Sequence, residues 1–321
     1  MGPKADQIDW NVSRRQCLTF MAGAVAAAMA PRPCFAEEHG PLLRVAISTE
    51  TLAGANINDA RAAYTVWIRE VTKHMGSVHA EVVPEIFLPS EQLLSAIRRG
   101  AVDCYGITAL EYVKVADLTD PNFYLLQDYL ADGMEYVLLV HNSSPFRRLA
   151  DLRGAQILTH YHRDMVLLPA WLGTMLEANN LPPADKFFGS QMTRDSVNQV
   201  ALPVFFRRVD GACLARRSWE TAVELNPQLG RDVRALAVSP KVVPIAVCFR
   251  HNSSAEARHA LLDAVVNITA LPAGQQIVAM YQAHAFVVRT SAVMKTAVDM
   301  VTQYQRLLAQ QQSSNSRKGH P

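Results

Sequence analysis

The sequence predicts an α/β fold of two similar lobes, each with a mixed, mostly parallel sheet flanked by helices. Short apolar runs with strand character alternate with helical patterns from residue 42 onward, which is typical of strands joined by crossover helices. The same alternation restarts near Glu135. A short stretch also recurs, with copies at Arg98–Cys104 and Arg207–Cys213 that each place Arg-Arg before a Val-Asp pair. This echo indicates two related units within one chain.

The first lobe is expected to begin with a strand over residues 42–47, followed by the polar segment 48–51. A helical pattern follows from about residue 58 to residue 75, with Trp67 and Val71 on one face. The remaining elements of this lobe are expected as a strand at 80–84, a helix at 90–97 and a strand at 102–107. These elements together predict a sheet with helices on its faces.

The second lobe is expected to begin with a strand over residues 135–140. A helical turn closed by Gly154 leads to a second strand at 155–159. The further elements are expected as a helix at 165–179, a strand at Phe187-Phe188, a helix at 196–207 and a strand at 209–214.

The C-terminal third contains more elements than a compact second lobe can hold. Apolar runs at 233–239 and 242–249 are followed by helical patterns at 255–271, 273–283 and 291–311. We therefore expect residues from about 245 onward to return and pack on the first lobe. The polar residues 312–321 are expected to form a disordered tail.

The N-terminal segment has the pattern of an export signal. Arg14-Arg15 precedes a stretch without charge, Leu18–Ala30, and a small residue, Ala36, follows shortly. The apolar stretch is too short to span a bilayer, which takes about 20 residues. We interpret residues 1–36 as a twin-arginine signal that is cleaved near Ala36, so that the mature protein works in the periplasm. The alternative is an ordinary secretory signal in which the arginine pair is a chance basic region.

Composition excludes several classes of function. The chain has 31 basic and 29 acidic residues, and removal of residues 1–36 leaves 27 of each, so no basic surface for nucleic acid is expected. The three cysteines beyond that segment, Cys104, Cys213 and Cys248, lie far apart in apolar runs and are expected to be buried free thiols. No glycine-rich phosphate loop or cysteine cluster predicts a cofactor.

Several short motifs occur in an order that resembles a known family. They are Leu43–Glu50, Ala101–Thr108 with Tyr112, Phe146–Gly154, Arg208–Ala212, Leu236–Ser239 with Pro244, and Pro272–Val278 through His284–Phe286. This order resembles type II periplasmic solute-binding proteins of ABC transporters, and among them the phosphate, phosphite and phosphonate group. The resemblance implies two lobes, at 37–137 plus 245–311 and at 138–244, joined by two hinge crossings near 135–141 and 238–247. It also implies a small-molecule ligand between the lobes, closure on binding, and a monomer that works with an ABC permease.

Ligands of open α/β sheets bind beyond the carboxyl ends of the strands, where helix N-termini present free N–H groups. This rule and the resemblance nominate loops in both lobes. The candidate ligand-binding residues are Ser48, Thr49, Glu50, Thr108, Tyr112, Thr159, His160, Tyr161, His162, Arg163, Arg194 and Asp210. The pair His160-x-His162 could bind a metal ion, but a hydrogen-bonding or stacking role is favoured. Alternate residues of an extended loop point to opposite sides, and no third ligand is near.

One loop departs from the pattern of the similar proteins. The phosphonate-binding relatives have a small Ser/Thr-rich loop before the first helix of the second lobe, whereas this chain has His160–Asp164. The bulky rings are expected to reshape the pocket. Arg163 could still hold an anion through two parallel hydrogen bonds.

Three functions from different classes remain open at this point. The leading one is a periplasmic receptor that delivers a small, anionic, phosphonate- or phosphate-like solute to an ABC permease. The second is a sensor that passes a ligand-dependent conformation to a membrane histidine kinase or cyclase. The third is an enzyme on the same scaffold, which no nucleophile or base with a partner supports.

Overall fold

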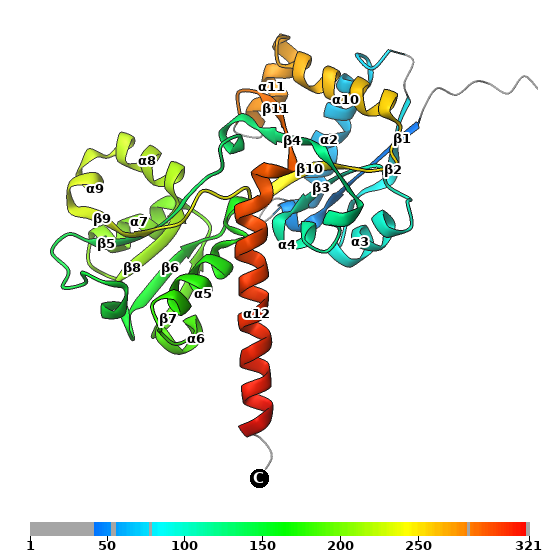
Figure 1. Ribbon diagram of the computed structural model, residues 1–321. Coiled ribbons are helices and arrows are strands. Elements are labelled where there is room, and N and C mark those ends of the chain that lie inside the picture. Colours follow the sequence, from blue (N-terminus) through cyan, green and yellow to red (C-terminus); the bar gives the residue numbers. More distant parts are fainter. Residues whose placement is uncertain (1–41, 53–55, 77–78, 281–282, 319–321) are drawn as a thin grey trace, which may run out of the picture. The chain divides into compact units, whose positions relative to one another are not determined.

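The computed structural model describes residues 42–52, 56–76, 79–280 and 283–318, and the predicted export signal lies outside these residues. The described chain forms two mixed sheets, each with its own helices (Figure 1). The first sheet has the order β11-β4-β10-β3-β1-β2. Its strands are β1 (Leu42–Ser48), β2 (His79–Leu88), β3 (Cys104–Thr108), β4 (Thr119–Gln127), β10 (Ile245–Arg250) and β11 (Phe286–Arg289). The predicted α/β fold class is confirmed.

The second sheet has the order β7-β6-β8-β5-β9. Its strands are β5 (Tyr136–His141), β6 (Gln156–His160), β7 (Ser190–Arg194), β8 (Gly211–Ala215) and β9 (Val233–Val238). In each sheet three strands are parallel, β2-β1-β3 and β7-β6-β8, and an antiparallel strand follows, β10 or β5. The two sheets therefore repeat one arrangement, as the echo in the sequence indicated.

The repeated Val-Asp pair has the same structural task in both sheets. The Asp103 carboxylate accepts a hydrogen bond from the backbone N–H of Arg44, at the start of β1, over 3.1 Å. The Asp210 carboxylate accepts one from the backbone N–H of Gln156, at the start of β6, over 2.8 Å. Each carboxylate thus binds a backbone N–H in the amino-terminal half of a neighbouring strand, Arg44 being the third residue of β1 and Gln156 the first of β6, so the repeated motif makes the same contact twice.

Helices cover both sheets, and most lie where the sequence predicted them. The α-helices are α2 (Ile57–Thr72), α3 (Ser90–Arg98), α4 (Ala109–Tyr112), α5 (Leu168–Ala178), α6 (Ala184–Phe187), α7 (Val197–Phe205), α8 (Arg216–Leu225), α9 (Pro227–Asp232), α10 (Ala255–Ile268), α11 (Pro272–Met280) and α12 (Lys295–Lys318). Short 3-10 turns are η2 (Thr49–Leu52), η3 (Ala116–Leu118), η4 (Asp128–Leu130), η5 (Leu149–Leu152), η6 (Arg163–Met165) and η7 (Ser291–Met294). Across the described ranges, no helix combines the length and the apolar character that a membrane span needs.

The chain passes between the two sheets twice, through residues 128–135 after β4 and residues 239–244 after β9. The two crossing segments pair with each other as an antiparallel bridge. Met134 N–H donates to the Val242 carbonyl over 2.8 Å, and Val242 N–H donates to the Met134 carbonyl over 2.9 Å. Gly133 adopts a φ of 77°, and a side chain there would meet the Val242 backbone at 3.1 Å. The crossings therefore form a short two-stranded ribbon.

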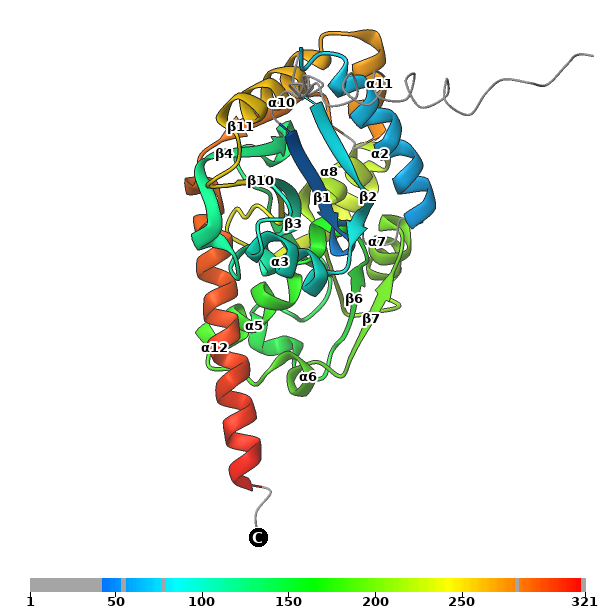
Figure 2. The same ribbon diagram turned by 90° about the vertical axis from the view of Figure 1, so that its right-hand side faces the viewer.

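Residues from 245 onward return to the first sheet, since β10 and β11 both pair with β4. The last helix departs from this expectation, because α12 contacts α5 of the second sheet as well as α4. Both views show α12 beside α5 and extending past it (Figures 1 and 2). A close approach is possible because Gly173 on α5 faces the ring of Tyr304.

Two expectations for the elements were wrong, and some elements were not predicted. Phe187-Phe188 was expected to form a strand, but Phe187 ends the short helix α6 and the strand β7 begins at Ser190. Both phenylalanines are apolar because they pack into the core at the end of this helix. Strands β4 and β11 were not predicted. The segment 312–318 was expected to be a disordered tail but continues α12, because it contains no glycine or proline before Gly319 and a helix propagates easily once it has started.

The three cysteines Cys104, Cys213 and Cys248 are free and buried. Burial raises the pKa of the Cys213 thiol to about 12, and it also raises the pKa of Cys104 and of Cys248. All three thiols therefore stay protonated and inert at neutral pH. This confirms the prediction of buried free thiols.

Candidate functional site

A cavity of about 820 Å³ lies where loops of the second sheet meet the first sheet. Strand and helix residues of the first sheet form one side, and the loops after β6 and β7 form the other. The first side consists of Ile47, Thr51, Leu52, Asp59, Ala60, Ala63, Tyr64, Trp67, Phe87, Gly106, Leu125, Gln127, Ile245, Val247 and Phe286, and the second of Tyr161, His162, Arg163, Asp164 and Asp195. The turns η2 and η6 contact each other beside the cavity.

The loop after β6 is held in place by its own side chains. The Asp164 N–H donates to His162 Nδ1 over 3.3 Å, so His162 caps the turn η6. The buried Tyr136 hydroxyl donates to the Asp164 carbonyl over 2.6 Å. This loop therefore presents Arg163 and Asp164 to the cavity from a fixed backbone.

The Asp164 carboxylate is the centre of a polar cluster. The Tyr129 hydroxyl lies 3.3 Å from Oδ2, His162 Nδ1 lies 3.6 Å from Oδ2, and Arg163 Nε lies 3.7 Å from Oδ1. Burial, and then the Asp164 charge, raise the pKa of Tyr129 to about 12. Tyr129 therefore keeps its proton, and its hydroxyl donates a hydrogen bond to the carboxylate. Asp164 in turn compensates part of the Arg163 charge.

His160 and His162 stack with ring centroids 5.5 Å apart and planes inclined by 13°. Burial and the neighbouring His162 lower the pKa of His160 from 6.5. Burial also lowers the pKa of His162, although Asp164 opposes this effect. Both imidazoles are therefore neutral at pH 7, and Arg163 is the fixed positive charge of the loop. Among the described residues no group of three His, Cys, Asp or Glu side chains is placed to hold a metal ion.

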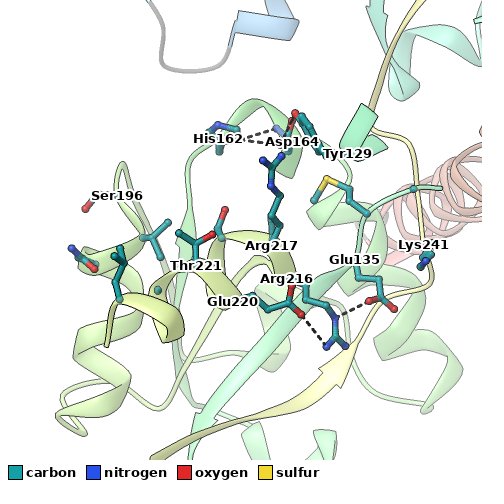
Figure 3. A pocket seen from close by; sticks show the side chains of 18 residues that line it. Tyr129, Glu135, His162, Asp164, Ser196, Arg216, Arg217, Glu220, Thr221 and Lys241 are labelled. Carbon is teal, nitrogen blue, oxygen red and sulfur yellow. Dashed lines mark hydrogen bonds and ion pairs between the residues drawn. The ribbon is translucent and has the colours of Figure 1, made fainter. Parts of the chain in front are cut away.

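A second cavity, of about 610 Å³, shares His162 and Asp164 with the first and extends toward the start of α8 (Figure 3). Arg216 Nε lies 2.7 Å from Glu135 Oε2 there, and the Arg217 guanidinium lies 4.4 Å above the ring of Tyr129. Figure 3 shows Arg217 reaching toward the Asp164 end of the cavity and Arg216 turned toward Glu135. Helix α8 begins at Arg216 without a side-chain cap, so its first N–H groups add a partial positive charge at this wall.

The structure brings three of the nominated residues of the second lobe to the first cavity: Tyr161, His162 and Arg163. Thr159 lies behind them, where its hydroxyl pairs with that of Thr193 over 3.0 Å. His160 is buried under His162. Arg194 is exposed and donates to the Thr193 carbonyl over 2.8 Å.

The nominated residues of the first lobe are not brought to the cavity. Ser48 is buried and hydrogen-bonded to Glu111, and Thr108 caps α4 in a reciprocal box with the same glutamate. The Tyr112 hydroxyl pairs with that of Tyr124 over 2.8 Å inside the core. The set without a place in either cavity wall is Ser48, Thr49, Glu50, Thr108, Tyr112, Thr159, His160, Arg194 and Asp210. A role in ligand binding stays a prediction for them.

Several residues that do line the cavity were not nominated from the sequence. Thr51 and Leu52 follow the nominated Ser48–Glu50 and line the cavity in their stead, because the chain turns into η2 directly after β1. Trp67 was predicted on one face of a helix without a role at the site, and the spacing alone does not distinguish a core face from a cavity wall. The strand β4, which supplies Gln127, was not predicted. The crossing that supplies Tyr129 was predicted near 135–141 but lies at 128–135, because residues 136–141 form β5.

Comparison with known proteins places the chain in a family. Residues 58–292 match the model of a family described as "ABC transporter, phosphonate, periplasmic substrate-binding protein". No curated protein matches the sequence. Among solved structures, a binding-protein component of an ABC phosphonate transporter from Pseudomonas aeruginosa is 17% identical, with a TM-score of 0.52 over 83% of this chain and 87% of that one.

Two further structures share the fold. A Xanthomonas citri protein bound to ATP is 17% identical, with a TM-score of 0.58 over 83% of this chain and 99% of that one. PhnD1 from Prochlorococcus marinus in complex with methylphosphonate is 14% identical, with a TM-score of 0.54 over 82% of this chain and 98% of that one. The chain described here belongs to the family of periplasmic substrate-binding proteins of phosphonate ABC transporters.

Proposed function

We propose that this protein captures a small anionic solute of the phosphonate or phosphate type and delivers it to the permease of an ABC transporter. The observation that carries the proposal is the position of Arg163. It lines the larger cavity from a loop whose backbone is fixed, and both neighbouring histidines are neutral. A guanidinium binds the oxygens of a phosphonate through parallel, charge-assisted hydrogen bonds.

The family and two neighbours support this choice of ligand. The family is described as phosphonate-binding, and two solved structures of the same fold hold ligands with phosphorus oxyanions, methylphosphonate and ATP. We expect the two sheets to close around the solute by bending at the paired crossings near Met134 and Val242, as in hinge closure of other periplasmic receptors.

The test is a titration of the purified mature chain with methylphosphonate, inorganic phosphate and methylsulfonate. Trp67 lines the cavity, so its fluorescence is expected to report binding alongside isothermal calorimetry. Saturable binding of at least one of these anions, with one site for each chain, is the expected result. If none of the three anions binds at millimolar concentration, the proposed ligand class is wrong.

We also propose that the twin-arginine pathway exports the protein. Replacement of both Arg14 and Arg15 by lysine keeps the charge of the N-terminal segment but removes the arginine pair that this pathway reads. The expected result is a precursor that stays in the cytoplasm, measured by fractionation and immunoblotting. An unchanged periplasmic yield would show that the chain uses another export route.

A further inference from the structure

The larger cavity has an extended apolar wall that a small oxyanion alone would leave uncovered. We propose that the natural ligand carries an apolar body, alkyl or aromatic, of several carbon atoms attached to its polar head. This inference rests on the proposed function for the head and adds the class of the remainder. The volume of about 820 Å³ falls within the range of about 300–1,000 Å³ that is typical of cavities for drug-sized ligands.

The apolar side of the cavity is a rigid wall. Helix α2 turns Ala60, Ala63, Tyr64 and Trp67 toward the cavity, and this spacing places all four on one helix face. Tyr64 and Trp67 have ring centroids 5.0 Å apart. The aromatic rings continue to Phe87, 5.9 Å from Tyr64, and to Phe286, 6.2 Å from Trp67.

These rings are anchored in the core of the first sheet. Tyr64, Trp67, Phe87 and Phe286 are each at most 8% exposed and belong to one cluster with Val71 and its neighbours. The wall is therefore formed without any contribution from the second sheet. Its chemistry does not depend on how far the two sheets close.

The charged groups lie on the other side. Arg163, Asp164 and Asp195 come from loops of the second sheet, and the second cavity continues from Asp164 toward Arg217 and Lys241 (Figure 3). Asp59, near the start of α2, is the one carboxylate or cationic side chain that the first sheet's side gives to the larger cavity among the residues described. An ionic head is accommodated among these groups, whereas burial of a charge against the aromatic wall would be costly.

A ligand that complements both sides has a polar head and an apolar body. Each methylene group moved from water onto the wall is expected to raise affinity about fourfold. Methylphosphonate would occupy only the polar side. Straight-chain phosphonates from methyl to butyl, together with phenylphosphonate, therefore measure the wall directly.

The experiment compares this phosphonate series by calorimetry on the mature chain, with the corresponding alkylamines as a second series. The inference expects affinity to rise about fourfold with each added methylene group, and phenylphosphonate to bind more tightly than methylphosphonate. If methylphosphonate binds and longer chains bind no more tightly, the inference of an apolar body is wrong, while the proposed function stands. If only the amines bind and their affinity rises with length, the anionic head is wrong and the apolar body stands. If neither series binds, both proposals fail.

A pair of variants distinguishes ligand contacts with the apolar wall from general effects of substitution on folding. Ala63→Phe fills the cavity from α2 and is expected to abolish the dependence of affinity on chain length. Ala62→Phe is the matched control, because Ala62 is exposed on the same helix and does not line the cavity. Thermal unfolding of both variants checks that they are folded. A length dependence that persists in Ala63→Phe would place the apolar body elsewhere and overturn the assignment.

Discussion

Replacement of Arg163 by alanine is expected to weaken the binding of methylphosphonate by about 10- to 150-fold. A hydrogen bond to a charged group contributes about 1.5–3 kcal/mol, and this range converts to that loss of affinity. Arg163 lines the cavity, whereas the carboxylate beside it, Asp164, repels an anion once the guanidinium is removed. Calorimetric titration of the wild type and the variant measures the difference.

Two further variants make this result specific. Arg163→Lys keeps the charge but loses the planar pair of donors, so an intermediate affinity is expected. Arg194→Ala is the matched control: the same residue type at the end of the neighbouring strand β7, exposed and outside both cavity walls. Equal affinities of the wild type and Arg163→Ala would show that the anion binds elsewhere. A large loss in Arg194→Ala would place it near β7, as the sequence also suggested.

The fold could be predicted from the sequence because its strands and helices have strong local patterns. Strand β3 and helix α3 are a short apolar run and an amphipathic face, and both occur at the expected residues. Strand β4 was missed because Asp120, Pro121 and Asn122 interrupt its apolar pattern. It forms because β10 and β11 pair with it on both sides, and this pairing is set by parts of the chain more than a hundred residues away.

The site was harder to predict than the fold, and for a physical reason. Ligands of open α/β sheets bind beyond the carboxyl ends of strands, and this rule placed residues 161–163 at the cavity. These residues follow directly after the carboxyl end of β6. Ser48 and Thr108, nominated by the same rule, do not line the cavity, because a third residue, Glu111, binds both of them inside the fold. A single glutamate that satisfies two hydroxyls can be recognised only when the three residues are seen together.

Asp210 was nominated as a ligand residue, and its carboxylate makes the same kind of contact to a strand backbone N–H as that of Asp103. Asp103 is 5% exposed. Its Oδ2 accepts from Arg44 Nε over 2.7 Å, its Oδ1 accepts from Arg44 Nη2 over 2.9 Å, and Arg250 Nη2 lies 3.7 Å from Oδ1. The carboxylate thus lies between two guanidinium groups at the amino end of β1. Neither Asp103 nor Asp210 lines a cavity wall, and the lining residues Ile47 and Thr51 lie at or just after the carboxyl end of β1.

Asp103→Ala is expected to lower the free energy of unfolding by about 2–4 kcal/mol, because it removes a carboxylate that holds two cations and one backbone N–H. The range stays below that of a fully buried pair, since Arg44 and Arg250 keep 33% and 22% of their side-chain surface exposed and water screens them in part. Asp210→Ala removes the corresponding contact to Gln156 and is expected to cost about 1 kcal/mol. Urea unfolding of both variants measures these losses, and the methylphosphonate affinity of the folded fraction should stay within about twofold of the wild type. A loss of affinity in Asp210→Ala at unchanged stability would instead make Asp210 a binding residue, and the parallel between the two Val-Asp pairs would then be coincidental.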